Sequence, residues 1–270
     1  MQELVSLFAF VYGAAIASFL DVVSERAVNH GPLTGRSHCP ACGKKLLWWE
    51  LVPIFSWLWL LGKCSQCRVL IPQRHLFEEL GLGLLFGFSA WQIISDSSGA
   101  GEFTLLFFVL ISFSGLALAF FADFRFYIIP DSAWITAVVG ATGLVALRAF
   151  DVIEQRLLPP AFSQAGLGIL LAVVFLAVFA MVSRGAWMGW GDVKLAVALG
   201  ALVGYPLILF SLAFSFILGA FVGLALVMLR AKTLKQTIPF GPFLIIPPVV
   251  MYFVPEIWLR NLLAFFLFSN

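Results

Sequence analysis

Charged side chains are scarce in this sequence. Only 11% of its 270 residues are Asp, Glu, Lys or Arg, whereas 62% are hydrophobic. A soluble domain of this length needs far more polar surface to cover its core. The composition therefore excludes an ordinary soluble domain and indicates a membrane protein.

Polar interruptions are also rare along the chain. Several apolar runs reach the roughly 20 residues that a helix needs to cross a bilayer. We therefore predict an all-α polytopic membrane protein with about eight transmembrane helices. The expected spans lie near residues 4–23, 76–95, 103–122, 132–149, 163–183, 192–207, 209–230 and 243–268.

The first apolar run lacks the features of a secretory signal. Only Met1, Gln2 and Glu3 precede it, so it has no basic flank, and no small-residue cleavage site follows it. A secretory signal has both features. We expect this run to be a retained transmembrane helix.

Basic residues are distributed unevenly between the predicted loops. Thirteen of the sixteen fall on one side of the membrane, and seven of these lie in residues 24–75. Because cytosolic loops carry an excess of Lys and Arg, we expect this side to face the cytosol and both termini to lie outside. The net charge of +2 reflects this topology and gives no reason to expect a nucleic-acid partner.

Residues 24–75 form the only sizeable hydrophilic insertion. We therefore divide the chain into a first transmembrane helix (1–23), a small cytosolic domain (24–75) and a transmembrane domain (76–270). Within the insertion, residues 46–61 are apolar but short, and they contain Pro53 and four tryptophans. Indole rings favour the headgroup region, so this run is expected to lie on the membrane surface. A packed face of the small domain is the alternative.

All four cysteines lie in this insertion, as two CxxC pairs separated by 21 residues. The reducing cytosol disfavours disulfides, and CxxC pairs at this separation suit a tetrahedral zinc site. A redox pair or an iron centre is the alternative. Four thiolates fill the coordination sphere of zinc, so the predicted role is structural. The expected ligands are Cys39, Cys42, Cys64 and Cys67.

Two aspartates stand apart from the other acidic residues. Asp123 ends the third predicted span and Asp192 begins the sixth, so the topology places both at the cytosolic end of the membrane. Ionisable groups at this depth are costly and are candidates for function. Gly189 and Gly191 precede Asp192, and without Cβ atoms they allow close approach of backbone and substrate.

Two carboxylates brought together in a poorly hydrated cleft share a proton and titrate as a pair. In aspartic proteolysis, one carboxylate activates a water molecule while the protonated one polarises the scissile carbonyl. Helix capping is the alternative role for Asp123 and Asp192. Asp131, which follows Pro130, is expected to cap a helix.

Prolines flank Gly241 in the segment 238–243. Proline stops helix propagation, so the last span is expected to begin with a re-entrant or sharply bent turn. A simple helix break is the alternative.

These segments resemble the bacterial type IV prepilin peptidases, which are membrane aspartic proteases of the GxGD type. Residues 189–195 (GWGDVKL) resemble the family's GxGD segment, and residues 123–131 resemble its first aspartate motif. The CxxC pairs, the PFGPF turn at 239–243 and the SFL segment at 18–20 also fit. Together these motifs extend along most of the chain.

The resemblance implies that Asp123 and Asp192 are the catalytic pair and that Gly189 and Gly191 support them. It implies a bacterial inner-membrane enzyme that removes a short basic leader from prepilin or pilin-like secretion precursors. Bifunctional members of the family then methylate the new N-terminus with S-adenosylmethionine. That second activity is associated with a large cytosolic loop, which this chain has.

The chain departs from the family pattern near its first two spans. Asp21 stands where the family usually has asparagine, and residues 26–28 (RAV) stand where arginine-leucine-proline is common. His75 and Leu76 replace a tyrosine and a proline, whereas Glu79 falls where the family has glutamate. These changes lie in the region tied to methyl transfer and leader recognition, so they put both in question.

Two other functions are compatible with intramembrane aspartates. The protein could be a GxGD-type protease with other membrane substrates, or a transporter or scaffold whose aspartates relay protons or cap helices. Transporters place carboxylates near the bilayer midplane and often have paired halves. Here both aspartates are expected at one face and no internal repeat is visible, which favours the peptidase.

Overall fold

The computed structural model describes residues 1–28, 35–94, 99–150, 152, 158–233 and 236–268. These residues form two compact units, Met1–Gly99 and Ala100–Asn270. The regular structure is helical throughout the described residues, apart from two isolated β-bridges in the first unit. The expected all-α class is therefore confirmed.

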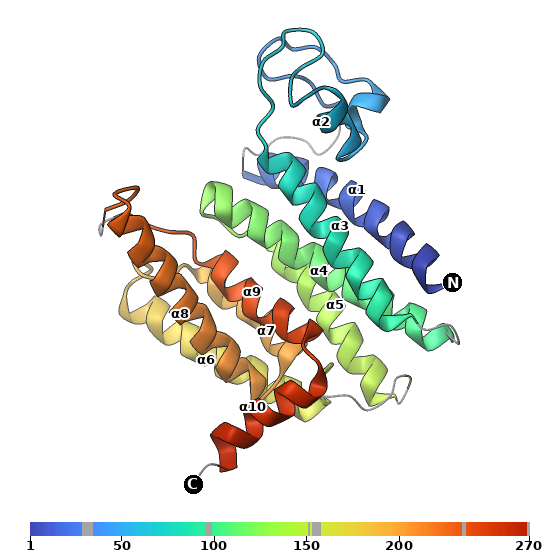
Figure 1. Cartoon of the computed structure of the whole chain (residues 1–270). Helices are drawn as coiled ribbons and strands as arrows, with labels where there is room; N and C mark the ends of the chain where they lie inside the picture. Colours follow the sequence, from blue (N-terminus) through green and yellow to red (C-terminus); the bar gives the residue numbers. More distant parts are fainter. Residues whose placement is uncertain (29–34, 95–98, 151, 153–157, 234–235, 269–270) are drawn as a thin grey trace. The chain divides into compact units, whose positions relative to one another are not determined.

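In the first unit, two long helices lie side by side and carry the cysteine loop at one end (Figure 1). They are α1 (Gln2–Val28) and α3 (Arg74–Ile93), and the loop contains the short helices η1 (Trp48–Leu51) and α2 (Phe55–Trp59). A Cβ atom on Gly13 of α1 would lie 2.7 Å from a backbone oxygen of α3. Glycine therefore sets the close approach of the two helices.

The apolar run at 46–61 folds into the loop with some of its rings exposed. Trp57 packs against Gly62 and directs its indole N–H to the carbonyl of Ile71, whereas Trp48 and Trp59 are 78% and 70% exposed. Part of the run is thus packed within the loop. Contact of the exposed indoles with a membrane surface stays a prediction.

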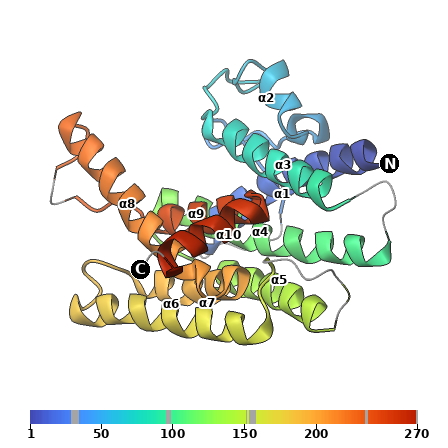
Figure 2. The same ribbon diagram turned by 60° about the horizontal axis from the view of Figure 1, so that its bottom comes forward.

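The second unit is a bundle built around one short helix. That helix, α7, packs against four neighbours, and ten of its fourteen residues are buried. Figure 2 shows α6 and α7 lying next to one another. The helices of this unit are α4 (Ala100–Phe126), α5 (Asp131–Ala149), α6 (Phe162–Val182), α7 (Trp190–Val203), α8 (Leu207–Met228), α9 (Gly241–Phe253) and α10 (Glu256–Phe268).

Glycines also bring the helices of this bundle together. A Cβ atom on Gly140 of α5 would lie 2.3 Å from the backbone nitrogen of Ser112 on α4, and one on Gly200 of α7 would lie 2.6 Å from the backbone of Ile169 on α6. No larger residue fits at these crossings. Such small-residue contacts are typical of helices that pack in membranes, where association depends on close van der Waals contact.

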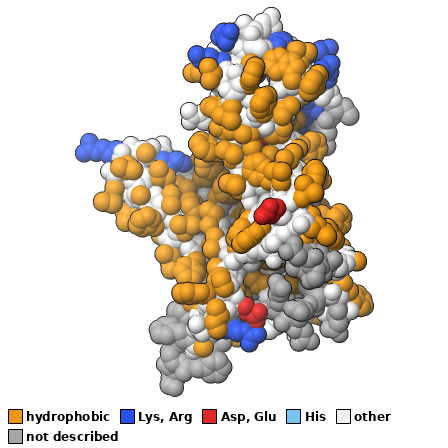
Figure 3. Space-filling view, turned by 45° about the vertical axis from the view of Figure 1, so that its right-hand side comes forward, with side chains coloured by type: hydrophobic (Ala, Val, Ile, Leu, Met, Phe, Trp, Pro, Cys, Tyr) orange, Lys and Arg blue, Asp and Glu red, His pale blue; other side chains and the backbone are white. Residues whose placement is uncertain are grey.

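Five of the described helices are long and apolar enough to cross a bilayer: α1, α4, α5, α6 and α8. The pair α9–α10 adds a sixth if it is one span. Hydrophobic side chains cover much of the face in Figure 3, and several Lys and Arg side chains lie on the surface of the cysteine loop. The structure thus supports a multi-pass membrane protein with five or six candidate spans, and the expected total of eight is not confirmed.

The two remaining predicted spans, 76–95 and 192–207, correspond to α3 and α7, which are not among the candidate spans. The helix α3 carries Arg74, Glu78 and Glu79 in its first turns. The helix α7 ends at Val203 because Gly204 adopts a φ of +70°, a conformation that favours glycine and terminates helices. At 14 residues, α7 rises only about 21 Å.

The last predicted span, 243–268, is two helices rather than one. A bend of 112° separates α9 from α10 at a break that contains Pro255. Residues 237–240 precede α9 without helical structure, as the prolines around Gly241 predicted. The 112° bend at the far end of α9 is a further feature that we had not expected, and a bent turn at its start stays a prediction.

Candidate active site and metal centre

Asp123 lies near the end of α4 and is buried, with 6% of its surface exposed. The backbone N–H of Gly241, at the start of α9, donates a 2.8 Å hydrogen bond to its Oδ2 atom. A Cβ atom at position 241 would lie 2.7 Å from that same oxygen. The glycine of the PFGPF turn therefore permits the contact that positions this carboxylate.

Asp192 lies in the first turn of α7 and is 7% exposed. Its Oδ2 accepts a 3.2 Å hydrogen bond from the backbone N–H of Gly189, so the carboxylate does cap its own helix. A Cβ atom on Gly191 would lie 3.1 Å from the side chain of Ile129. Gly191 thus allows α7 to approach the segment that links α4 to α5.

The structure brings the two aspartates together, although 69 positions separate them in the sequence. Their carboxylates lie near enough to interact electrostatically. The helices that carry them, α4 and α7, both pack against α5 and α9, which accounts for the approach. Capping and pairing are compatible, because Asp192 can accept one backbone N–H while it faces a second carboxylate.

Asp131 is the first residue of α5, but it does not cap the helix as expected: the N-cap is Pro130, and no side chain caps the helix. Asp131 Oδ1 accepts hydrogen bonds from Trp134 Nε1 at 2.8 Å and from Lys194 Nζ at 2.6 Å. Lys194 follows Asp192 by two residues, so this exposed ion pair ties the first turn of α7 to the start of α5. No local sequence signal identifies this pair, because its partners are 63 positions apart.

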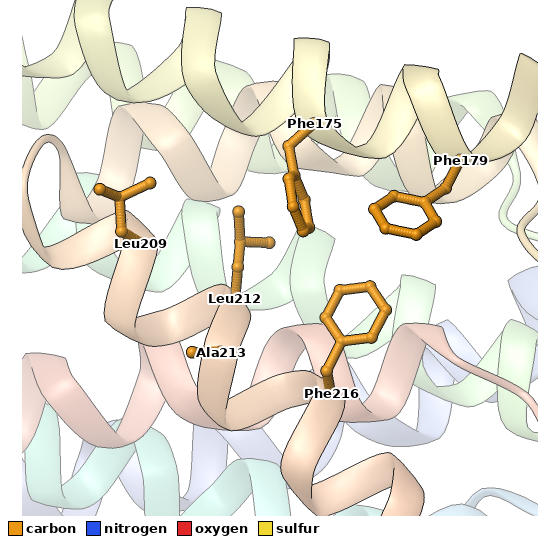
Figure 4. A pocket seen from close by; sticks show the side chains of 6 residues that line it. All are labelled: Phe175, Phe179, Leu209, Leu212, Ala213 and Phe216. Carbon is orange, nitrogen blue, oxygen red and sulfur yellow. The ribbon is translucent and has the colours of Figure 1, made fainter.

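An apolar pocket of about 480 Å³ lies between α6 and α8 (Figure 4). The ring of Phe216, in its wall, lies 5.0 Å from the ring of Phe240, the residue before Gly241. The pocket thus adjoins the turn that holds Asp123, but its lining offers no group for proton transfer. The lining residues are Phe175, Phe179, Leu209, Leu212, Ala213 and Phe216.

The four cysteines form a compact cluster in the loop of the first unit. Their sulfur atoms all lie within 4.8 Å of one another, and the Sγ atoms of Cys39 and Cys67 are 3.8 Å apart. Four sulfurs placed tetrahedrally at about 2.3 Å from a zinc ion stand about 3.8 Å from one another. The donor set and its spacing therefore fit a metal ion held by Cys39, Cys42, Cys64 and Cys67.

The two CxxC turns have the same backbone pattern. The N–H of Gly43 bonds to the carbonyl of Cys39, and the N–H of Arg68 bonds to that of Cys64. Both Gly43 and Arg68 adopt a positive φ. Within the second turn, the backbone amides of Cys67 and Gln66 lower the pKa of the Cys64 thiol to about 6. These amides thus favour the thiolate form of Cys64, which is the form that binds metals.

Glu50 joins the two turns from the buried side of the loop. Its carboxylate accepts hydrogen bonds from Lys44, beside the first turn, from Ser65, within the second, and from the backbone N–H of Leu47. Burial opposes its ionisation, but the N–H of Leu47, the Lys44 ammonium and the Ser65 hydroxyl outweigh it and lower the pKa of Glu50 to about 2. Nothing in the sequence pointed to this role for Glu50.

A second polar cluster lies where α1 meets α3. His75 Nδ1 lies 2.9 Å from Asp21 Oδ2, and Glu78 contributes a third potential metal ligand. The neighbouring Glu79 accepts a 2.6 Å hydrogen bond from the backbone N–H of Ile54, which anchors the loop to α3. Asp21 and His75 were noted in the sequence as departures from the family pattern. The sequence did not show that their side chains are in contact.

The fold and the two sites define a polytopic membrane protein with a pair of buried carboxylates and a cluster of four cysteines that fits a metal ion. Comparison with family models then identifies the family to which the chain belongs. Residues 11–93 match the bacterial peptidase A24 N-terminal domain, and residues 110–224 match the type IV leader peptidase family. The chain belongs to the type IV leader peptidase family, as the sequence motifs predicted.

Curated relatives carry the name prepilin leader peptidase/N-methyltransferase. The protein from Stutzerimonas stutzeri is 32% identical over 78% of this chain and 68% of its own length. The Pseudomonas putida protein is 31% identical over 84% of this chain and 75% of its own length. The Aeromonas hydrophila protein is 28% identical over 88% of this chain and 86% of its own length. No solved structure matches the chain.

Proposed function

We propose that this protein is a membrane aspartic endopeptidase that removes the leader from prepilins or pilin-like secretion precursors. Asp123 and Asp192 are the proposed catalytic pair. The observation that carries the proposal is the meeting of two buried carboxylates from separate helices, each held by the N–H of a glycine. Family membership supports the substrate class, since the relatives described above are named for prepilin cleavage.

The chemistry follows from two carboxylates that share one proton. The ionised member takes a proton from a water molecule, which attacks the carbonyl carbon of the scissile peptide bond. The protonated member donates a hydrogen bond to the carbonyl oxygen, where negative charge develops. Proton transfer to the leaving nitrogen then breaks the C–N bond and releases the leader. Gly189 and Gly191 support the site by leaving the backbone open beside Asp192.

We propose that the site faces the cytosol of a bacterial inner membrane, with both termini on the outer side. The concentration of basic residues in the loops on the cysteine-loop side supports this orientation. Two termini on the same side require an even number of crossings. The five long helices and the α9–α10 pair give six candidate spans. The helices α3 and α7 would bring the total to eight if each crosses the membrane. A precursor with a hydrophilic leader and an apolar helix presents its scissile bond at that boundary.

The cysteine cluster is the proposed site of a structural zinc ion. Its four sulfur donors would fill a tetrahedral coordination shell. Zinc would then stabilise the folded loop and would have no open position for catalysis. A second activity, N-methylation with S-adenosylmethionine, is supported by the names of the relatives and by the presence of the loop. The described residues contain no glycine-rich strand-to-helix turn of the nucleotide-binding kind, and we assign none of them to the methyl donor.

The test is cleavage of a prepilin in detergent or liposomes, read by mass spectrometry. Wild type should release the leader, and Asp123→Asn and Asp192→Asn should each abolish release while keeping their zinc and their elution in gel filtration. Glu256→Gln is the matched control, since its carboxylate pairs with Arg260 at the surface of α10. Cleavage retained in either aspartate variant would refute the pair.

Adding S-adenosylmethionine to the same reaction tests the second activity, because the product should then gain the mass of one methyl group. A folded wild type that cleaves other membrane substrates but no prepilin would instead identify a GxGD protease of different specificity.

A further inference from the structure

Asp21, His75 and Glu78 present three metal-ligating side chains to one point between α1 and α3. One ligand atom from each lies within 4.8 Å of the other two. The cluster is distinct from the four cysteines and from the proposed catalytic pair. It combines an imidazole nitrogen with two carboxylate oxygens, which is a donor set for divalent transition-metal ions.

The helices hold these side chains on a rigid scaffold. His75 and Glu78 are three residues apart on α3, so they lie on the same face of the helix. A Glu and a His at this spacing supply inward-facing ligands in carboxylate-bridged metal sites of helical bundles. Asp21 approaches from α1, which the glycine contacts keep close to α3.

The distances match those around a bound ion. Ligands at about 2.1 Å from a first-row metal stand about 3.0 Å apart when adjacent in an octahedron. The separation between His75 Nδ1 and Asp21 Oδ2 is 2.9 Å. An ion can therefore enter between these atoms with small side-chain movements.

The surroundings favour a cation at this point. Asp21 is only 7% exposed, and the carboxylate of Glu79 lies nearby, where it interacts with Ser18 and Ile54. A simple ion pair between Asp21 and His75 uses two of the three converging side chains. The third adds another carboxylate, and carboxylates gathered in a buried site are stabilised by a multivalent cation between them.

We propose that Asp21, His75 and Glu78 bind a divalent first-row transition-metal ion that ties α1 to α3 at the base of the cysteine loop. Three protein ligands leave positions open for water or another small oxygen ligand. The nitrogen and oxygen donors accept harder ions such as Mn²⁺, which four thiolates bind poorly. This site does not depend on the proposed peptidase activity.

The test uses Mn²⁺, which binds oxygen and nitrogen donors and competes poorly for four thiolates. The full chain, purified in detergent with only one equivalent of zinc, which the four thiolates bind first, is titrated with Mn²⁺, and the free ion is measured by electron paramagnetic resonance. One Mn²⁺ should bind per chain. His75→Gln and Glu78→Gln should each weaken binding by about 10-fold or more without changing the zinc content.

Two matched variants control for loss of a histidine or a carboxylate elsewhere. His38→Gln removes an exposed imidazole in the cysteine loop, and Glu102→Gln removes a carboxylate at the start of α4. Both should bind Mn²⁺ as wild type does. Zinc content reports folding of the loop, so a variant that loses Mn²⁺ but keeps zinc supports the site.

Two results would overturn the proposal. If zinc-loaded wild type binds no Mn²⁺, Asp21 and His75 form an ion pair and nothing more. If His75→Gln and Glu78→Gln bind Mn²⁺ as tightly as wild type, the ion lies at another position.

Discussion

The backbone N–H of Gly241 holds the carboxylate of Asp123 across 118 positions of sequence, at 2.8 Å. The contact joins the end of α4 to the start of α9, and it exists because residue 241 has no side chain. One of the two proposed catalytic groups is thus oriented by a main-chain donor, which cannot rotate away as a side chain can.

Gly241→Ala should therefore impair cleavage. The new methyl group would lie 2.7 Å from Asp123 Oδ2 and 3.2 Å from its Cβ, so the carboxylate must turn away. We expect the rate constant for leader release to fall by about 100-fold, as is typical when a reacting group is misplaced by about 1 Å. Gly166→Ala, where a Cβ meets nothing within 4 Å, is the control and should cleave normally. Equal rates for the two variants would show that the Gly241 contact does not position Asp123.

The ion pair between Asp131 and Lys194 should affect catalysis more than stability. Their side chains are 64% and 48% exposed, so losing the pair should change the free energy of unfolding by only about 0.2–1 kcal/mol. Because the pair fixes the first turn of α7, Lys194→Met should lower kcat about 10-fold and leave KM nearly unchanged.

A double-mutant cycle checks this interpretation. Asp131→Asn and Lys194→Met should have non-additive effects on kcat, because they remove the same contact. Arg260→Met breaks a comparable exposed pair with Glu256 and should leave kcat unchanged. Additive effects in the cycle would mean that the two residues act separately.

Zinc analysis of the purified chain should find one ion bound to the cysteines. Cys64→Ser should lose it and allow faster proteolysis within the loop, since a metal contributes on the order of 10 kcal/mol to the folding of small zinc domains. His38→Gln, next to Cys39 but outside the cluster, should keep both the ion and the resistance. An unchanged digestion pattern in Cys64→Ser would argue against a metal clamp.

The ion pair of Glu50 should make the loop sensitive to acid. Its pKa is lowered to about 2 from the usual 4.5, so its ionised form stabilises the folded loop. This stabilisation is complete above about pH 4.5 and is lost as the pH falls toward 2. Hydrogen exchange in residues 44–65 should therefore be faster in Glu50→Gln than in wild type at pH 6, and the difference should shrink at pH 3. A difference of the same size at both pH values would contradict this linkage.

The sequence predicted the local features of this protein, whereas most contacts between distant residues could not be predicted from it. The apolar runs predicted the long helices to within a few residues, as for α4 and α8, and the CxxC spacing predicted the sulfur cluster. The meeting of Asp123 and Asp192 followed from topology, because both were expected at one face. That these two residues are catalytic stays a prediction until variants are assayed.

Other features escaped the sequence because their partners are distant or their signals are weak. Apolar residues continue on both sides of Pro255, so the 112° bend looked like one uninterrupted span. The expected span 192–207 did not show that Gly204 ends α7 after 14 residues. The contacts of Asp131 with Lys194, and of Asp21 with His75, join residues more than fifty positions apart.

The short length of α7 affects how water can reach the proposed active site. With a rise of about 21 Å, α7 is roughly 9 Å shorter than a hydrocarbon core of about 30 Å. If α7 lies across the membrane, at least one of its ends is recessed from the membrane boundary. Asp192 stands at one end of α7. A recess of this kind lets the aqueous phase extend into the bilayer's thickness as far as a carboxylate, and so brings the co-substrate of hydrolysis to a depth where water is otherwise absent.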